Sequence, residues 1–137
     1  MISLLLYNDL DTESSDIDKE YEINKQVFQK LDSLIRRDEL YLSADLSRED
    51  LVRMAHMNNT RFAKMIKENT GTNLSGYINE LRLNHAIHLL KEHPEYTLRA
   101  IAEASGINSM PTFHSLFKNK TGMTPSEFKK TQMDMKQ

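Results

Sequence analysis

The sequence predicts an all-α protein of about seven helices, in which two helix-turn-helix units are joined by a long linker helix. Apolar residues recur at spacings of three and four, and no stretch alternates between apolar and polar residues with a period of two. Capping residues precede most of these periodic segments, and glycine or proline follows several of them. A pattern of about 50 residues also occurs twice along the chain.

Composition narrows the classes of protein to which the chain can belong. With 137 residues, 39% of them apolar, it is long enough for one domain or two very small ones. The absence of cysteine excludes disulfide frameworks, thiolate zinc sites and catalytic thiols. The longest apolar run, Leu4 to Tyr7, is too short to cross a bilayer and lacks the flanks of a signal peptide. We therefore expect a cytoplasmic protein with no membrane segment.

The net charge of −2 conceals a division between an acidic leader and a basic body. Residues 1–46 carry eleven acidic and five basic side chains, whereas residues 47–131 carry eight acidic and twelve basic ones. Because charges act within a Debye length of about 10 Å, the body can bind a polyanion although the whole chain is slightly acidic. Residues 1–22 are rich in Asp, Glu and Ser with little apolar periodicity, which predicts a flexible leader.

Three helices are expected in the first unit. The opening helix should end near Asp38 and carries an apolar stripe: Ile23, Val27, Leu31, Leu34 and Ile35. Ser47 and Asp50 approximate a capping box, with Asp in place of the usual Glu or Gln, and predict the next helix start. Asn58 caps a third helix, which Gly71 ends. Its inward residues are Phe62, Met65 and Ile66.

Four further helices follow. A linker helix over about residues 74–92 should bury Ile78, Leu81, Ala86, Leu89 and Leu90. Thr97 caps a short helix that continues to Ala104. The next helix, over about residues 110–120, directs Phe113, Leu116 and Phe117 inward. Thr124-Pro125 opens the last helix, and residues 132–137 form a tail.

The repeat relates two parts of the body. At an offset of 51, the matching residues are Phe62 and Phe113, Lys67 and Lys118, Thr70-Gly71 and Thr121-Gly122, and Ser75 and Ser126. Upstream the offset is 50, so the second copy has one extra residue at about 109–112. Each copy reads as a helix, a turn and a second helix whose outer face is free. The sequence thus predicts one domain over residues 23–131, with helix-turn-helix units at about 23–72 and 97–131.

Two such units favour binding to double-stranded DNA. A linker of about 18 residues spans about 27 Å, and successive major-groove faces lie about 34 Å apart. We therefore expect a sequence-specific DNA-binding transcription regulator whose two recognition helices read successive major-groove segments. A helical protein–protein interaction module that does not bind DNA is the alternative. It would explain the apolar stripes and the acidic leader, but not the basic residues on the repeated outer faces.

Outward positions of the two units supply the candidate contacts to DNA. The base-edge candidates are Thr60, Ala63, Lys64, Met110, Pro111, Thr112 and Ser115. The phosphate candidates are Ser47, Arg48, Asn59, Arg61, Lys67, Thr97, Arg99, His114, Lys118 and Thr124. The second recognition helix has no Arg or Lys at its leading end, so we expect the first to contribute more sequence discrimination.

The sequence does not predict an enzyme. It contains no Gly-rich phosphate loop, and its Ser, His and acidic residues form no arrangement for nucleophilic catalysis. His85 and His88 are spaced so that they could share a metal ion, but no carboxylate is expected on the same face. We accordingly expect no catalytic residues, no metal and no cofactor.

Several short motifs lie between residues 40 and 130. They are Asp45-Leu46-Ser47 through Leu51, Lys67-x-x-x-Gly71, Arg82-Leu83-x-x-Ala86-x-x-Leu89-Leu90, Ile101-Ala102-x-x-x-Gly106-Ile107, Phe113-x-x-x-Phe117-Lys118 and Gly122-x-Thr124-Pro125-Ser126-Glu127-Phe128. Together they resemble the C-terminal DNA-binding domain of the AraC/XylS transcription regulators. The resemblance implies seven helices with two helix-turn-helix units that bind promoter DNA, and RNA polymerase as a further partner.

This chain differs from the pattern of that family in two respects, and each leads to an expectation. Family members often carry Arg where this chain has Ser115, which weakens the expected sequence reading by the second unit. They usually possess a sensory or dimerisation domain, for which 137 residues leave no room. The chain is therefore expected to be an isolated output domain or a short stand-alone regulator, and a homodimer on DNA stays open.

Overall fold

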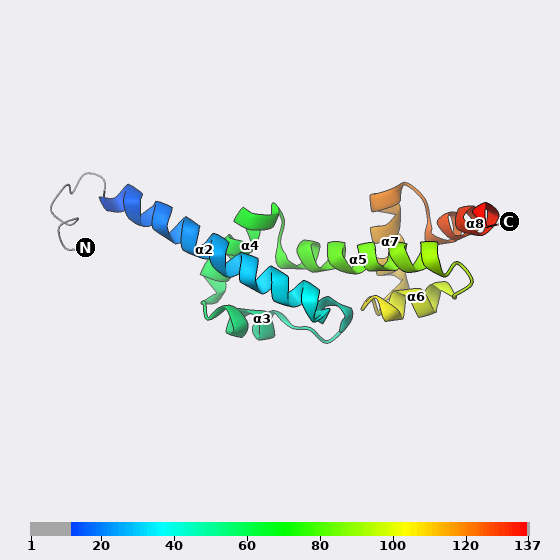
Figure 1. Cartoon of the computed structure of the whole chain (residues 1–137), viewed down its shortest axis with the longest axis horizontal. Helices are drawn as coiled ribbons and strands as arrows, with labels where there is room; N and C mark the ends of the chain where they lie inside the picture. Colours follow the sequence, from blue (N-terminus) through cyan, green and yellow to red (C-terminus); the bar gives the residue numbers. More distant parts are fainter. Residues whose placement is uncertain (1–11, 137) are drawn as a thin grey trace.

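The computed structural model describes residues 12–136, so Leu4 to Tyr7 and the rest of residues 1–11 lie outside the described part. The described residues form seven α-helices and one short 3-10 helix, with no strand (Figure 1). The elements are α2 (Thr12–Arg37), η1 (Leu40–Leu42), α3 (Arg48–Ala55), α4 (Asn59–Thr70), α5 (Leu74–Glu92), α6 (Leu98–Ala104), α7 (Met110–Thr121) and α8 (Pro125–Met135). The predicted all-α fold is confirmed.

Helix α2 begins earlier than the sequence predicts. The apolar stripe starts at Ile23, but the helix starts at Thr12, so residues 12–22 are helical where a flexible leader is expected. This segment contains no Gly or Pro, and extending an existing helix by one residue is far less costly than nucleating a new one. The packed second half of α2 supplies that nucleus. A solvated extension needs no apolar stripe of its own, which is why periodicity did not reveal it.

The hydrophobic core consists of two clusters, and α5 contributes to both. The first cluster comprises Leu31, Ile35, Leu51, Ala55, Phe62, Met65, Ile66, Tyr77, Ile78 and Leu81. The second comprises Leu83, Ala86, Leu90, Ile101, Ala102, Ile107, Phe113 and Phe117. The first half of α5 packs into the first cluster and its second half into the second. The linker helix α5 therefore contributes side chains to the cores of both units, which limits how far the units can move relative to each other.

The two copies of the repeat close their second helices in the same way. The hydroxyls of Thr70 and Thr121 donate to the carbonyls of Ile66 and Phe117, at 2.7 and 2.8 Å. Gly71 and Gly122 then adopt φ values of 78° and 79° as left-handed C-caps. The copies differ at their turns. Residues 56–58 connect α3 to α4, whereas residues 105–109 connect α6 to α7. The second turn is two residues longer and α6 is one residue shorter than α3, which leaves the second copy one residue longer.

Arg82 and Gly106 fix the second unit against η1. The Arg82 Nε donates to the carbonyl of Tyr41 at 2.6 Å, and its Nη2 donates to the carbonyl of Ser43 at 2.8 Å. Gly106, at the turn of the second unit, has a φ of 81°, and a Cβ built there would lie 2.7 Å from the Tyr41 carbonyl oxygen. The segment around η1 is thus held between α5 and the second helix-turn-helix turn.

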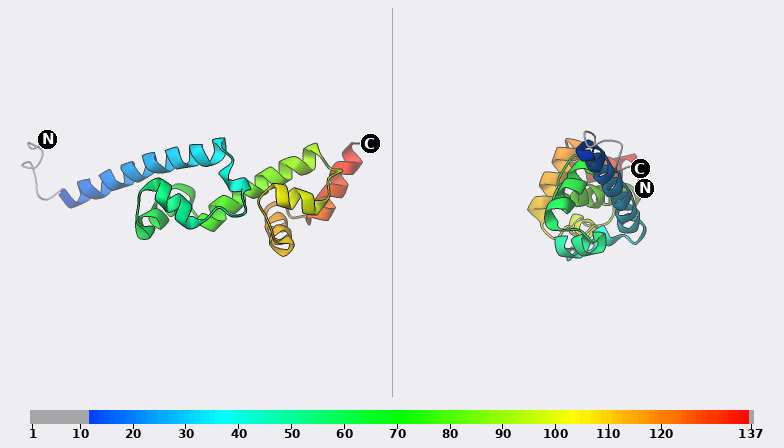
Figure 2. Two further views of the ribbon diagram at one scale, coloured as in Figure 1. Left: turned by 90° about the horizontal axis from the view of Figure 1, so that it is seen from below. Right: turned by 90° about the vertical axis from the view of Figure 1, so that its left-hand side faces the viewer.

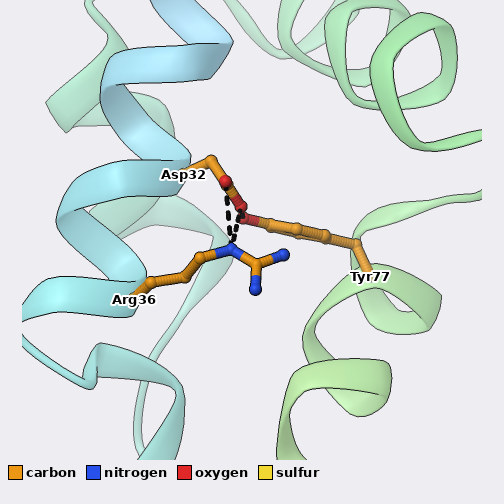
Figure 3. A network of polar contacts seen from close by, with 3 residues as sticks. All are labelled: Asp32, Arg36 and Tyr77. Atoms are coloured by element: carbon orange, nitrogen blue, oxygen red, sulfur yellow. Dashed lines mark hydrogen bonds and ion pairs between the residues drawn. The ribbon is translucent and has the colours of Figure 1, made fainter.

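A polar contact also joins α2 to α5. The Tyr77 hydroxyl donates to the Asp32 carboxylate, which pairs with Arg36 Nε at 3.0 Å (Figure 3). Burial, together with this carboxylate, raises the pKa of Tyr77 above its ordinary value, so the phenol stays protonated and continues to donate. The Tyr77 ring packs against Phe28 with ring centroids 5.5 Å apart. These contacts anchor the second half of α2 to the first core.

Replacing Tyr77 with Phe should lower the free energy of unfolding by about 1–2 kcal/mol, because the half-buried Asp32 loses a charge-assisted hydrogen bond while the ring packing is kept. Urea unfolding followed by circular dichroism measures the change. Tyr21→Phe is the matched control, since Tyr21 is 45% exposed, and it should change stability by less than about 0.5 kcal/mol. Equal effects of the two substitutions would contradict the anchoring role of the hydroxyl.

Candidate nucleic-acid interface

The second helices of the two units, α4 and α7, lie on the same side of the molecule. In Figure 1, α2 passes in front of α4, and α5 passes in front of α7. The side view in Figure 2 (left) shows α2 along one edge and α7 projecting from the opposite edge. The 19 residues of α5 span about 28 Å, which is comparable to the spacing of successive major-groove faces, about 34 Å.

The leading half of α4 presents small and basic side chains to solvent. Phe62 faces the core, whereas Thr60, Ala63 and Lys64, the base-edge candidates of the first unit, are exposed. The Asn58 side chain caps the helix by accepting a hydrogen bond from the backbone N–H of Arg61 at 2.8 Å. This cap fixes the start of α4, and with it the direction of the exposed side chains.

Arg48, at the start of α3, connects to the start of α4. Its Nε donates to the Asn59 side-chain oxygen at 3.4 Å, and its guanidinium lies over the Phe62 ring, 5.4 Å from the centroid. Arg48 and Lys67 line a shallow pocket between α4 and the start of α5, together with Ala63. Lys67 also donates to the Gly71 carbonyl at 3.1 Å. Two phosphate candidates from different helices are thereby brought to one concave surface.

Two other candidates on α4 face α2. The Arg61 Nε donates to the Asn24 side-chain oxygen at 2.9 Å, and the Lys64 ammonium lies 3.4 Å from the Glu20 carboxylate. Asn24 is fully buried and Arg61 is half-buried, so Arg61 points to the neighbouring helix and not to open solvent. Sequence reasoning missed these partners because they lie 37 and 44 residues upstream, and no local pattern connects them.

The equivalent helix of the second unit, α7, exposes five of the six candidates that it contains. Those exposed are Pro111, Thr112, His114, Ser115 and Lys118. Met110 differs, since it is half-buried and packs against the second core. A long apolar side chain at the first position of a helix gains more from that core than from solvent, which explains its direction. The exposed face is therefore more polar than expected, and its leading end carries no cation.

The predicted helix-start candidates act as N-caps. The hydroxyls of Ser47, Thr97 and Thr124 each accept a hydrogen bond, at 3.0 to 3.1 Å, from the backbone N–H three residues ahead. Asp50 and Glu127 complete capping boxes by accepting from the backbone N–H of Ser47 and Thr124. These hydrogen bonds lower the pKa of both carboxyls, so each stays ionised at its helix start to a lower pH than an ordinary carboxyl. Arg99, the remaining candidate in this group, is exposed on α6.

His85 and His88 are the residues at which the sequence raises a metal site. Within the part of the chain that the structure describes, no group of three or more His, Asp or Glu side chains could hold a metal ion. His85 is half-buried, with its ring 6.3 Å from that of Tyr41, and burial lowers its pKa. None of the helices over residues 12–136 is long and apolar enough to cross a membrane.

The chain is similar in sequence to known regulators. A family model described as a helix-turn-helix domain matches residues 51–131. YesN of Bacillus subtilis, named as an uncharacterized transcriptional regulatory protein, is 39% identical over 80 residues, which are 58% of this chain and 22% of that protein. The chain spans only 22 to 37% of the length of this and two further curated relatives.

Solved structures share the fold. A Listeria innocua protein described as of unknown function is 28% identical, with a TM-score of 0.66 over 76% of this chain and 95% of that one. The C-terminal domain of a two-component response regulator, yesN from Fusobacterium nucleatum, superposes with a TM-score of 0.67 over 76% of this chain and 98% of that one, at 22% identity. With the family match to more than half of the chain, these likenesses assign it: the chain belongs to the AraC-type helix-turn-helix family of DNA-binding domains of transcription regulators.

Proposed function

We propose that the chain binds double-stranded promoter DNA in a sequence-specific manner and inserts α4 and α7 into successive major-groove segments of one duplex. The observation that carries the proposal is the placement of two equivalent helices, with exposed polar faces, on one side of a shared rigid helix. A single helix-turn-helix unit would support it less well, because helical hairpins also occur in proteins that bind no DNA.

In the first unit, we assign base contacts to the exposed leading half of α4. The Lys64 ammonium can donate to guanine O6 or N7, and the methyl groups of Thr60 and Ala63 can pack against a thymine methyl. Arg48 and Lys67, which line the same pocket, are placed for phosphates on the flanking strand. Asn59, hydrogen-bonded to Arg48, would join them at the phosphate strand.

In the second unit, Thr112 and Ser115 are the base-edge candidates with hydrogen-bonding groups, and both are exposed on α7. Pro111 adds apolar contact at the leading end of the helix. The exposed side chains of His114, Lys118 and Arg99 would hold the backbone. Because hydroxyls donate and accept alike, they discriminate bases less than a cation does. The second unit would thus contribute mainly sequence-independent affinity for the duplex backbone. RNA polymerase would be a further partner of the bound regulator.

Salt titration of duplex binding tests the proposal. Four phosphate contacts by Arg48, Lys67, Arg99 and Lys118 predict that log K falls with log[salt] with a slope near about −3.6, which is about a hundredfold loss between 50 and 200 mM salt. Fluorescence anisotropy of a labelled duplex measures the slope. Lys67→Ala should reduce it by about 1. A flat response, or no binding, would contradict the proposal and favour the protein–protein interaction module.

A further inference from the structure

The end of the first half of α2, near Glu20 and Asn24, lies beside α4, whereas the start of α2 extends past the body (Figures 1 and 2). Glu20 pairs with Lys64, and Asn24 accepts from Arg61, so α2 meets α4 over about residues 20–24. Among all pairs of elements in residues 12–136, α2 and α4 have the most extensive contact. The contact reaches Lys64, a candidate base-reading residue, and it is visible in Figure 1 where α2 crosses α4.

Little else holds this half of α2 against the body. Ile17 and Tyr21 are 59% and 45% exposed, so the apolar residues of the segment do not pack into the core. Within the side chains that the structure describes, Glu20 makes the only hydrogen bond or ion pair that links residues 16–23 to another element. After Asn24 the situation changes, because Leu31 and Ile35 are buried and Asp32 binds Tyr77. Asn24 therefore marks the boundary between an anchored and a weakly held half.

The weakly held half is acidic. Between residues 16 and 22 it carries four carboxylates, Asp16, Asp18, Glu20 and Glu22, against one ammonium group, that of Lys19. Glu20 lies against α4, which is proposed to enter the DNA groove, and the other three carboxylates lie within one helical turn of it on α2. Carboxylates at that position repel the phosphate backbone, and their effect is strongest within a Debye length of about 10 Å.

Space imposes a second conflict. The major groove is about 12 Å wide, and a helix with its side chains is about 10–12 Å across. The groove that receives α4 is therefore filled, and a second helix beside α4 meets the phosphate strand that borders the groove. Because α2 contacts α4 at Lys64 and Arg61, that part of α2 would lie close to this strand when α4 enters the groove.

We propose that residues 16–23 form an acidic gate, which competes with DNA for the flank of α4 and moves away from it when DNA is bound. This inference rests on the proposed function. Asn24 suits the hinge of such a gate, because it is fully buried while its side-chain Nδ2 has no hydrogen-bond partner among the described residues. Its burial is thus incompletely compensated, and opening the helix at this point lets the amide bond to water.

A charge-matched pair of variants tests the gate. The chain and its variants are titrated with a fluorescein-labelled duplex selected by the wild-type chain from a random-sequence pool. Glu20→Gln should tighten binding about two- to fivefold, the range expected for release of an exposed ion pair. Glu22→Gln removes the same charge from the same helix and should have a smaller effect. When Lys64 is also replaced by Ala, Glu20→Gln should tighten DNA binding no more than Glu22→Gln does. Equal effects of the two variants in the wild-type background would overturn the gate.

A distance measurement supplies an independent readout. Because the chain has no cysteine, spin labels can be placed at Ile17→Cys on α2 and Glu68→Cys on α4, two exposed positions. The distance between them should lengthen when duplex is added, whereas a control pair at Ser33→Cys and Asn84→Cys should not change. Binding with an unchanged distance between residues 17 and 68 would overturn the gate and leave the proposed function intact. Absence of binding by every variant would overturn both.

Discussion

Replacing Gly106 with Ala is expected to lower the free energy of unfolding by about 3 kcal/mol, which corresponds to a fall in melting temperature of about 10 °C or more. Two costs add. The φ of 81° is unfavourable for a residue with a Cβ. The new Cβ would also lie 2.7 and 2.9 Å from the carbonyl oxygens of Tyr41 and Leu42, and these backbone atoms cannot rotate away as the end of a side chain can.

Gly71→Ala and Gly122→Ala separate the two costs. Both residues have nearly the same φ as Gly106, 78° and 79°, but a Cβ at either would meet nothing within 4 Å. Each substitution should therefore lower the free energy of unfolding only by the conformational cost, about 1 kcal/mol. Thermal unfolding of the three variants measures the difference. Equal losses of stability in all three variants would mean that the close approach of Gly106 to the first unit does not add to the cost of the substitution.

The first copy of the repeat supports this interpretation. At the offset of 50, His56 is the equivalent of Gly106, and it occupies the same left-handed region with a φ of 54°. A histidine can occupy this position because its side chain is exposed. The turn geometry alone therefore does not require glycine. The close contact with η1 is what requires glycine at position 106, and this contact holds the second unit in place relative to the first. A Gly106→Ala chain that still folds should bind DNA less tightly, because its two recognition helices are no longer held at a fixed separation.

Much of the fold could be predicted because its signals are local. The starts of α3, α4, α6 and α8 each carry a side chain that caps the helix, and the structure has a cap hydrogen bond at every one. The repeat could be recognised because the Thr-Gly ends and the buried aromatic residues occur twice at a fixed offset. Even the unusual capping box, with Asp50 in place of Glu or Gln, forms as the spacing predicts.

What sequence reasoning missed depends on contacts between distant residues. Asn24 looks like one more polar residue near a solvated leader, yet it is fully buried under Arg61. Arg61 and Lys64 look like free cations, and both have partners on α2. Met110 occupies an outward position on a helical wheel but packs against the second core. No local pattern encodes these pairings, because they arise only when the helices have packed.

The other large effect concerns how sequence discrimination divides between the two recognition helices. Changing a base pair under the leading end of α4 should cost about 1–3 kcal/mol, whereas changes under α7 should cost less than about 1 kcal/mol. The physical reason is the difference between the exposed faces. Lys64 offers a charged donor to a guanine edge, while Thr112 and Ser115 offer hydroxyls that can donate or accept and so tolerate several bases. Competition binding with every single base-pair change across the selected site measures both sets of costs.

Lys64 and Lys67 provide the matched comparison within α4, since both are exposed lysines on one helix. Lys64→Ala should weaken the selected site about 5- to 100-fold and random duplex much less, because it removes a base contact. Lys67→Ala should weaken both duplexes by the same factor, because a phosphate contact carries no sequence information. Equal base-pair costs under α4 and α7 would contradict the asymmetry. They would mean that both helices read the duplex through its shape, because hydroxyls alone cannot match the discrimination of a lysine.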